Sequence, residues 1–472
     1  MNQLYKALDG LTWVSRVLVG ALFVVSGLIK SNDALGFMYK LEEYFEPGAM
    51  NLEFLAPWGL ELAVFVCIAE ILLGVAILVG ALPKLTSVLT TVMMVFFTWL
   101  TWYTATCDPY GTKEIVDASG AVVEIANQCV LECGCFGNAI PLTAYQSFLK
   151  DVVLLLFVIP IVLSSFLGRI ELNSSKQGTA MYAAALVVTY LFAEGMLDWN
   201  FPVLYLAMNL LAAEAVKRRW QHPQKEWGMA GAVVVVTGLV QWYTLAHLPL
   251  KDYRPYAVGE SVIENRMTAE ELGLEGPEFD KEIRFHNPET GAETLVMQSR
   301  YMDEKLWDKN ADPGKTFNET YPEADWDNAR EVKIKDGYEQ RIMDFQMVDA
   351  EGNDLTDDIL AMDQPVLLHI SKDLAVMPTD WQDAFNALGL QAADRGWALF
   401  GLTNATADEH AAFAAEHGAT YPFLTCDQTE LKIVVRANPG LVLIDHGVVR
   451  KKWSGRDVPT PEELSELLTT GH

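Results

Sequence analysis

The chain has 472 residues, of which 51% are hydrophobic, and a formal net charge of −28 at pH 7. Its long apolar runs fall almost entirely within residues 1–247, whereas residues 251–472 carry 21 Lys and Arg against 43 Asp and Glu. Proteins bind nucleic acid through a basic face, whereas this surface is strongly acidic. Nucleic acid is therefore excluded as a partner. The composition predicts a membrane-embedded half followed by a solvated, acidic half.

Seven apolar runs are long enough, or nearly so, to cross a hydrocarbon core that requires about 20 helical residues. Backbone groups find no water in lipid, so these runs are expected to be helices in contact with the bilayer. The sixth run is short and opens at Pro202. The runs lie near 12–30, 57–82, 84–106, 143–168, 179–197, 201–216 and 228–247.

Cations in the short loops predict the orientation, because cytoplasmic loops are enriched in Lys and Arg. The strongest group follows the sixth run, and smaller ones follow the second and fourth. The N-terminus is then cytoplasmic, and the loops at 31–56 and 107–142 lie outside with everything after 247. The cations concerned are Lys84, Arg169, Lys176, Lys217, Arg218, Arg219 and Lys225.

Charged residues inside the apolar runs are the next signal, since they are costly in lipid and usually paired or functional. Arg16 lies in the first run, Glu61 and Glu70 in the second, and Glu194 in the fifth. We expect Arg16 to pair with Glu70 as a buried ion pair. The alternative is a site for protons or for a quinone headgroup.

Aromatic residues cluster at 96–103, at the end of the third run. An interfacial aromatic belt explains them, and a quinone ring stacked there is the alternative. The candidate quinone-binding residues are therefore Arg16, Glu70, Trp99 and Trp102, with a quinone as the only cofactor considered.

Four of the six cysteines fall within the external loop. Cys133 and Cys135 flank one glycine and can close a small, strained ring, and strained disulfides exchange readily. Cys107 and Cys129 provide a second pair able to relay electrons, although four cysteines allow three pairings. The alternatives are inert disulfides that pin the loop and a zinc site, which usually has a wider ligand spacing. No metal is predicted.

The loop runs into the fourth span, where Thr143 and Gln146 form a capping box. The positive end of that helix favours a nearby thiolate. Lys150 and Asp151, two turns further on, are expected to form an interfacial ion pair, with proton transfer as the alternative. Cys67 is expected to be a small buried hydrophobe.

The soluble half begins with a polar region at 257–340, with a helix expected at 268–274 and a hairpin at 282–299. Residues 341–472 alternate strands and helices, which predicts an α/β domain. Cys426 is expected to be buried there. The strands are expected at 341–348, 365–370, 397–402, 441–444 and 448–453, and the helices at 378–395, 406–418 and 459–470.

The four-span unit resembles the DoxX/MauE-like membrane family, in which MauE is a methylamine-utilisation accessory protein linked to disulfide maturation. The resemblance rests on Ser26-Gly-Leu-Ile-Lys30, Glu70-x3-Gly74 and Cys133-Gly-Cys-Phe-Gly137, within residues 10–170. It implies that Cys133 and Cys135 are the redox pair. The four-helix quinone-linked disulfide-forming enzymes are also similar, but their Cys-x-x-Cys is missing here.

The last region resembles a thioredoxin-like domain. Asp344–Gly352 looks like the first strand and turn of membrane-tethered thiol reductases. Asn438 and Pro439 look like the cis-proline segment, which implies a substrate-binding role for both. The usual Cys-x-x-Cys is absent, because 371–378 reads Ser-Lys-Asp-Leu-Ala-Val-Met-Pro. The resemblance therefore implies a module that binds clients without dithiol chemistry.

The sequence thus predicts a multi-pass α-helical membrane bundle joined to a soluble α/β thioredoxin-like domain, in a bacterial inner membrane with the soluble part in the periplasm. The expected units are 1–170, 171–250, 251–340 and 341–472. The expected function is that of a thiol–disulfide redox accessory protein, which forms disulfides in periplasmic clients or envelope proteins or relays electrons from them. The alternatives are a non-enzymatic envelope scaffold with structural disulfides and, motivated by the intramembrane charges, a transporter.

Overall fold

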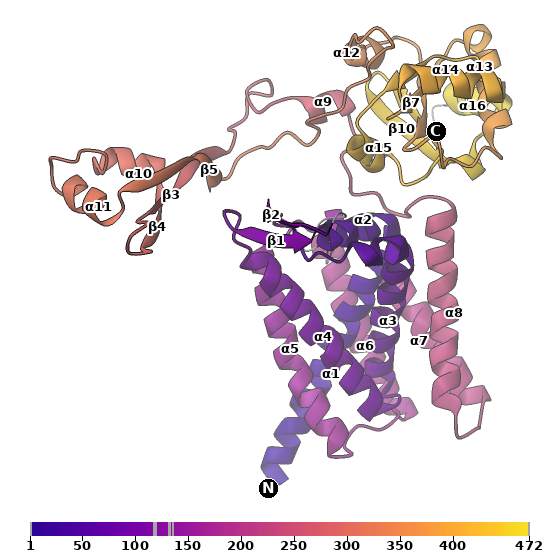
Figure 1. Ribbon diagram of the computed structural model, residues 1–472. Coiled ribbons are helices and arrows are strands. Elements are labelled where there is room, and N and C mark those ends of the chain that lie inside the picture. The colour runs from indigo at the N-terminus through magenta and orange to yellow at the C-terminus, as the bar shows by residue number, and fades with distance from the viewer. Residues whose placement is uncertain (1, 117–119, 131–133, 135, 471–472) are drawn as a thin grey trace.

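The computed structural model describes residues 2–116, 120–130, 134 and 136–470. Its first half is a helical bundle and its second half is two soluble units at one end of that bundle (Figure 1). The N-terminus lies at the opposite end of the bundle, and we call the end that carries the soluble units the loop end. The bundle helices are α1 (Asn2–Asn32), α3 (Gly59–Val79), α4 (Pro83–Ala105), α5 (Ala144–Phe166), α6 (Ser175–Phe192), α7 (Phe201–Arg219) and α8 (Lys225–Ala246).

Among the described residues, six helical segments are long and apolar enough to cross a membrane. The remaining predicted run forms α7, which is not one of the six because its last turns carry Glu214 and three cations, Lys217, Arg218 and Arg219. Helix α7 nevertheless lies within the bundle between α6 and α8 (Figure 1), and Tyr205 donates a hydrogen bond of 3.0 Å to Thr237 of α8. The multi-pass bundle is therefore confirmed.

Helices α1 and α3 pack closely because glycines face each other along their contact. A Cβ on Gly20 would lie 2.6 Å from Cγ of Leu78, and one on Gly74 would lie 2.7 Å from the carbonyl oxygen of Gly20. Small residues allow such close approach of membrane helices. This antiparallel register places Gly27 against Glu70, where a Cβ would lie 3.1 Å from the Glu70 Cβ.

Two segments for which no helix or strand is predicted have regular structure. Helix α2 (Ala34–Phe45) follows α1 directly, and Asp33 caps it by accepting a hydrogen bond from the Gly36 amide. In the cysteine loop, β1 (Thr112–Val116) pairs antiparallel with β2 (Val122–Ala126). The capping box of Thr143 and Gln146 at the start of α5 is confirmed.

The first soluble unit is an arm built on a three-stranded antiparallel sheet in the order β4-β3-β5. Its core is small and contains Ile283, Phe285, Val296 and Leu306. The predicted hairpin is confirmed, whereas 268–274 forms turns and not the expected helix. The elements are β3 (Glu278–His286), β4 (Glu293–Met297), α10 (Gln298–Asp303), α11 (Gly314–Thr320) and β5 (Glu323–Lys335), with α9 (Val262–Arg266) before them.

The second soluble unit has a five-stranded sheet in the order β10-β9-β6-β7-β8. Strands β6, β7 and β8 are parallel, whereas β9 runs antiparallel to both β6 and β10. This mixed sheet, with helices on its faces, has thioredoxin topology. The elements are α12 (Thr356–Leu360), β6 (Val366–Ser371), α13 (Gln382–Arg395), β7 (Ala398–Thr403), α14 (Ala407–His417), β8 (Phe423–Thr425), α15 (Gln428–Val434), β9 (Gly440–Asp445), β10 (Val448–Ser454) and α16 (Pro461–Thr470).

The central strand β6 is buried along its whole length and contributes to a core on each face of the sheet. Such two-sided burial is typical of the parallel part of an α/β sheet. The expected strand at 341–348 is wrong, because among the described residues this stretch pairs only through isolated bridges of Val348 with Asp354 and Thr425. Cys426 is buried, as predicted.

Candidate thiol-exchange site

The cysteine loop is closed at its base by a disulfide between Cys107, just after α4, and Cys129, just after β2. This is one of the pairings that the sequence allowed, and it removes two of the four thiolates that a zinc site would need. Both residues keep part of their surface exposed. Cys133 and Cys135 lie outside the described residues, so the site is built from their neighbours.

Gly134, between those two cysteines, rests on helix α2. Its φ of 68° is in the left-handed region, and a Cβ there would lie 2.8 Å from Cγ of Lys40. Glycine is thus required both by the backbone conformation and by the close contact. Lys40 itself forms an ion pair of 2.7 Å with Glu43.

Gly134 and Phe136 line a small crevice that also receives side chains from α1, α2, the linker before α9 and the thioredoxin-like domain. Cations outnumber acids on its walls. A positive environment lowers the pKa of a thiol and favours the reactive thiolate. The charged residues are Lys30, Lys40, Lys251, Arg254 and Arg436 against Asp33 and Asp252.

Below this crevice, Glu70 of α3 is buried and bound by Lys30 of α1. The Lys30 Nζ lies 2.9 and 3.0 Å from the two carboxylate oxygens of Glu70 and donates a further hydrogen bond of 2.7 Å to Ser26. Both charged side chains are nearly inaccessible to solvent. Each neutralises the other, since a single unpaired charge buried in the bundle would be costly.

The expected pairing of Arg16 with Glu70 is therefore wrong. Arg16 lies about four turns of α1 before Lys30 and donates to the carbonyls of Ile77 and Leu78 at the end of α3, and to Asn173. A cation at a helix C-terminus interacts favourably with the free carbonyls and the helix dipole. Arg16 thus caps α3.

A second ion pair lies on α5, where the Lys150 Nζ is 2.6 Å from the Asp151 carboxylate, as predicted for an interfacial pair. Asp151 is buried and accepts a hydrogen bond of 3.2 Å from Thr101 of α4. The Lys150 ammonium also lies 5.2 Å from the ring centroid of Phe136, the residue after Cys135.

A cavity of about 500 Å³ lies between these two ion pairs, within α1, α4, α5 and the end of α6. Glu70 lines it, but Arg16, Trp99 and Trp102 are not among the lining residues. Trp99 and Trp102 are about half exposed on α4, as the aromatic-belt interpretation predicts. The polar lining residues are Ser26, Lys30, Glu70, Gln146, Lys150 and Asp151.

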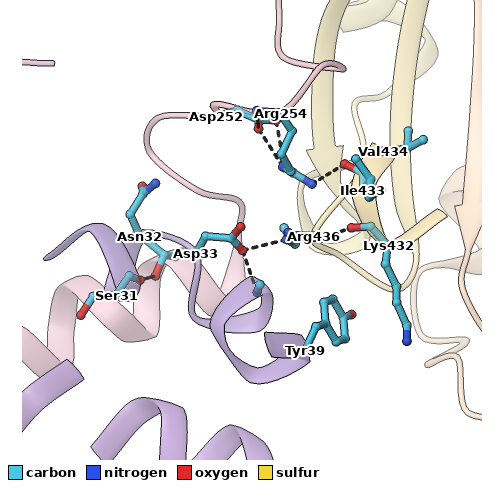
Figure 2. Close-up of polar contacts among 12 residues, drawn as sticks. Ser31, Asn32, Asp33, Tyr39, Asp252, Arg254, Lys432, Ile433, Val434 and Arg436 are labelled. Carbon is cyan, nitrogen blue, oxygen red and sulfur yellow. Dashed lines mark hydrogen bonds and ion pairs between the residues drawn. The ribbon is translucent and has the colours of Figure 1, made fainter. Parts of the chain in front are cut away.

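The thioredoxin-like domain contacts the loop end of the bundle through Asp33 and Arg436. Figure 2 shows Arg436 reaching Asp33 at the start of α2, with an Nε to Oδ1 distance of 2.7 Å. Burial opposes ionisation of Asp33, but the charges of Arg436 and Arg254 lower its pKa. The Arg436 guanidinium also stacks 5.4 Å from the ring centroid of Tyr39.

The face of the domain that meets α2 contains the segment where other thioredoxins carry Cys-x-x-Cys. Lys372 in this segment has its Nζ 3.3 Å from the Tyr39 hydroxyl. Burial, with the nearby charges of Arg436 and Arg254, lowers the pKa of Lys372 to about 7. Tyr39 is adjacent in sequence to Lys40, which contacts Gly134.

The expected cis-proline segment is confirmed, since the Asn438–Pro439 bond is cis. The Asn438 side chain accepts hydrogen bonds from Ser371 and the Lys372 amide, and donates one to the Asp373 carbonyl. Pro439 is buried. The geometry therefore gives Asn438 a role in holding the 371–373 segment, and substrate binding by this pair stays a prediction.

Sequence reasoning missed α2, Lys30 as the partner of Glu70, and the whole interface with the thioredoxin-like domain. Asp33, a potential helix cap three residues after Lys30, was the available signal for α2. The interface joins residues about 400 positions apart, so no local pattern announces it.

Comparisons with known proteins find matches to parts of the chain. Residues 8–109 match the family described as methylamine utilisation protein MauE. No curated protein matches the chain.

Three solved structures are similar to part of the chain, each with its own measures. A mutant of PrxQ from Xylella fastidiosa is 18% identical over 27% of this chain and 88% of that one, with a TM-score of 0.22. A putative protein disulfide isomerase from Bacteroides thetaiotaomicron is 23% identical over 27% and 82%, with a TM-score of 0.21. Reduced Prx3 from Vibrio vulnificus is 15% identical over 26% and 86%, with a TM-score of 0.21.

The chain thus combines a membrane segment similar to the MauE family over residues 8–109 with a soluble domain of thioredoxin topology.

Proposed function

We propose that this protein catalyses thiol–disulfide exchange at Cys133 and Cys135 in a bacterial inner membrane. The N-terminus lies in the cytoplasm, and the cysteine loop and the soluble half lie in the periplasm. The clients are periplasmic or envelope proteins with cysteine pairs. The MauE match over residues 8–109 supports a redox role for the membrane unit.

One observation carries the proposal: Gly134, the residue between the two cysteines, lines a cation-rich crevice. Helix α2 and the linker supply Lys40, Lys251 and Arg254, and the thioredoxin-like domain supplies Arg436. Thiols in such surroundings ionise more readily, and the thiolate is the attacking species. An inert structural disulfide has no need of this environment.

The exchange step is balanced within the protein and its client. A client thiolate attacks the Cys133–Cys135 disulfide and forms a mixed disulfide, releasing one of the two cysteines as a thiolate. The second client thiolate then displaces the other cysteine. The client gains its disulfide, and Cys133 and Cys135 hold the two electrons as a dithiol.

Cys107 and Cys129 form the second pair in this scheme and relay electrons to or from the first, for which their partial exposure is suitable. The thioredoxin-like domain presents the client. Its segment at 371–373 has no thiol, so its contribution is binding and positioning near α2.

Trapping the mixed disulfide tests the proposal. In cells carrying Cys135→Ser, the Cys133 thiolate attacks a client disulfide in the reverse exchange and has no resolving partner, so we expect a reducible adduct with client proteins after acid quenching and alkylation. The reciprocal Cys133→Ser variant shows which cysteine attacks. The Cys133→Ser/Cys135→Ser double variant should give no adduct. Cys67→Ala serves as a matched control, because Cys67 is a buried free thiol in α3.

The scaffold alternative predicts a different pattern. It is favoured by the Cys107–Cys129 bond, which closes the base of the β1–β2 hairpin. Under that function, the double variant folds, binds partners and supports growth like the parent, and neither single variant forms adducts. That combination of results would reject the exchange function.

A further inference from the structure

A polar pocket opens at the end of the bundle that carries the N-terminus, opposite the soluble units (Figure 1). It consists of two adjoining hollows of about 420 and 480 Å³, which share the lining residues Trp13, Arg16, Arg169 and Gln177. We call the two hollows together the N-terminal pocket. Its walls come from α1, the end of α5, the connection between α5 and α6, and the first turns of α6. Such volumes lie within the range of small-molecule sites, about 300–1,000 Å³.

The innermost cation of the N-terminal pocket is Arg16, which is only 8% exposed. Its Nε and Nη2 bind the carbonyls at the end of α3 and the side chain of Asn173. Among the described residues, none accepts a hydrogen bond from its Nη1. A donor on a largely buried charged group is costly when it is left without an acceptor. Because Arg16 lines both hollows, an acceptor that enters the pocket from outside the chain can take this hydrogen bond.

Two further cations, Arg169 and Lys176, line the same pocket. Asp9 binds the Nε and Nη2 of Arg169, with an Nε to Oδ1 distance of 2.6 Å. No residue in the described part of the chain accepts a hydrogen bond from the Nη1 of this arginine. Asp9 and Glu171 are the acidic lining residues, so three cations face two acids, one of which is already paired. Guanidinium groups with unused N–H donors suit the oxygens of a phosphate.

The depth of the N-terminal pocket matches that of lipid headgroups. Helix α1 reaches the loop end at Asn32, and Arg16 lies 16 residues before it, a distance of about 24 Å at about 1.5 Å per residue. The hydrocarbon core is about 30 Å thick, so Arg16 lies near its boundary at the N-terminal end. Trp13 is 41% exposed and lies where interfacial tryptophans are enriched. Leu167 is 56% exposed and adds an apolar wall. An occupant with a charged head and apolar chains therefore fits the pocket.

We propose that the N-terminal pocket binds the phosphate of an anionic phospholipid from the leaflet at this end of the bundle. The phosphate oxygens accept hydrogen bonds from Arg16 and Arg169, Lys176 adds its charge, and the acyl chains lie along Trp13 and Leu167. Basic pockets between membrane helices recognise such headgroups. Phosphatidylcholine has the same phosphate but would bring a second cation beside the arginines, so it is disfavoured. This binding does not depend on the thiol-exchange function proposed above.

Binding of radiolabelled dioleoylphosphatidylglycerol to the full chain in dodecyl maltoside micelles tests the ligand class. We expect saturable binding that dioleoylphosphatidylcholine at the same mole fraction does not displace. Arg169→Gln/Lys176→Gln removes two cations but keeps Arg16, which also caps α3, so the variant should fold and its affinity should fall about tenfold or more. Lys84→Gln/Arg219→Gln is the matched control, because both residues are exposed at the same end of the bundle and are not among the lining residues. Its affinity should equal that of the parent.

Two further measurements separate the pocket from general attraction of anions to this end of the bundle. Ala180→Trp fills the pocket from α6 without a change of charge and should weaken binding, whereas Ala183→Trp, at an exposed residue of α6 that is not among the lining residues, should not. Glycerol 3-phosphate provides a phosphate without acyl chains and should displace the labelled lipid poorly. The inference is overturned by equal binding of the two lipids, by equal losses in the two double variants, or by displacement with glycerol 3-phosphate as effective as with unlabelled phosphatidylglycerol at the same concentration.

Discussion

At the scale of single residues, the ion pair of Lys30 and Glu70 is the most consequential feature of the membrane half. The sequence correctly singled out Glu70 as a charge that needs a partner, because carboxylates are rare in apolar runs. The predicted partner, Arg16, is wrong, because the partner of Glu70 depends on the register of α1 against α3 and is Lys30. That register is set by Gly20, Gly27 and Gly74, whose contacts no periodicity reveals.

Removing one charge of this pair should destabilise the bundle. Glu70→Gln leaves the buried Lys30 ammonium without its counterion, which should lower the free energy of unfolding by about 3 kcal/mol. Thermal unfolding in detergent would measure this. Glu43→Gln, which breaks the partly exposed pair with Lys40, should cost less than about 1 kcal/mol.

The double variant Lys30→Met/Glu70→Met distinguishes two causes of destabilisation, an unpaired buried charge and a loss of packing. Replacing both charges by apolar groups is often nearly neutral or stabilising, so this variant should unfold close to the parent temperature. Equal destabilisation in the single and double variants would contradict a paired-charge account.

At the scale of elements, helix α2 connects the cysteine loop with the thioredoxin-like domain. Its residues 39 and 40 contact Lys372 on one side and Gly134 on the other. The long apolar helices were predictable because about 20 apolar residues have few alternatives in a membrane. A twelve-residue helix with mixed polarity was not, since it is stabilised by packing on α3 and by contacts such as that of Asp33 with Arg436, which is encoded about 400 residues later.

Docking of the domain on α2 should depend on pH through Lys372. Its pKa is about 7 when docked and close to the ordinary value of 10.5 when exposed, so the docked form binds fewer protons above pH 7. Docking should therefore strengthen as pH rises from 7 toward 10, by at most about tenfold per pH unit, and should not change below pH 7. The charged and titratable neighbours are Asp33, Tyr39, Arg254, Lys432 and Arg436.

Proteolysis of the linker, or cross-linking between α2 and the domain, measures docking across that pH range. Lys372→Met should flatten the response while keeping the domain docked. Arg436→Ala, which leaves Asp33 buried without its partner, should weaken docking at every pH. A response that persists unchanged in Lys372→Met would assign the titration to another group.

At the scale of the whole molecule, the direction of α7 decides where the two halves lie. Helix α7 begins at the loop end and returns the chain to the N-terminal end, so that α8 can deliver the soluble half to the side of the cysteine loop (Figure 1). The sequence predicted this crossing from a short run alone. It did not predict how the soluble units contact the bundle, which depends on pairs such as Asp33 with Arg436.

Cysteines placed at the two ends of α7 test its crossing and the orientation together. Asp198 and Gln221 are both exposed and flank the helix. In intact cells, a membrane-impermeant maleimide should label Asp198→Cys and should reach Gln221→Cys only after lysis. Labelling of both without lysis would remove the crossing, and labelling of Gln221→Cys alone would invert the protein.

The linker between α8 and α9 has a further consequence. Its first residues are bound to both halves of the molecule: Asn32 of α1 binds the backbone of Leu250 and Lys251, and His247 binds Asp457 of the thioredoxin-like domain at 2.7 Å. A short tether holds the domain near α2 at a local concentration of about the millimolar range. Contacts too weak to hold two separate proteins together therefore suffice to keep the domain bound to α2. Each time the domain dissociates from α2, the tether keeps it close enough to bind again.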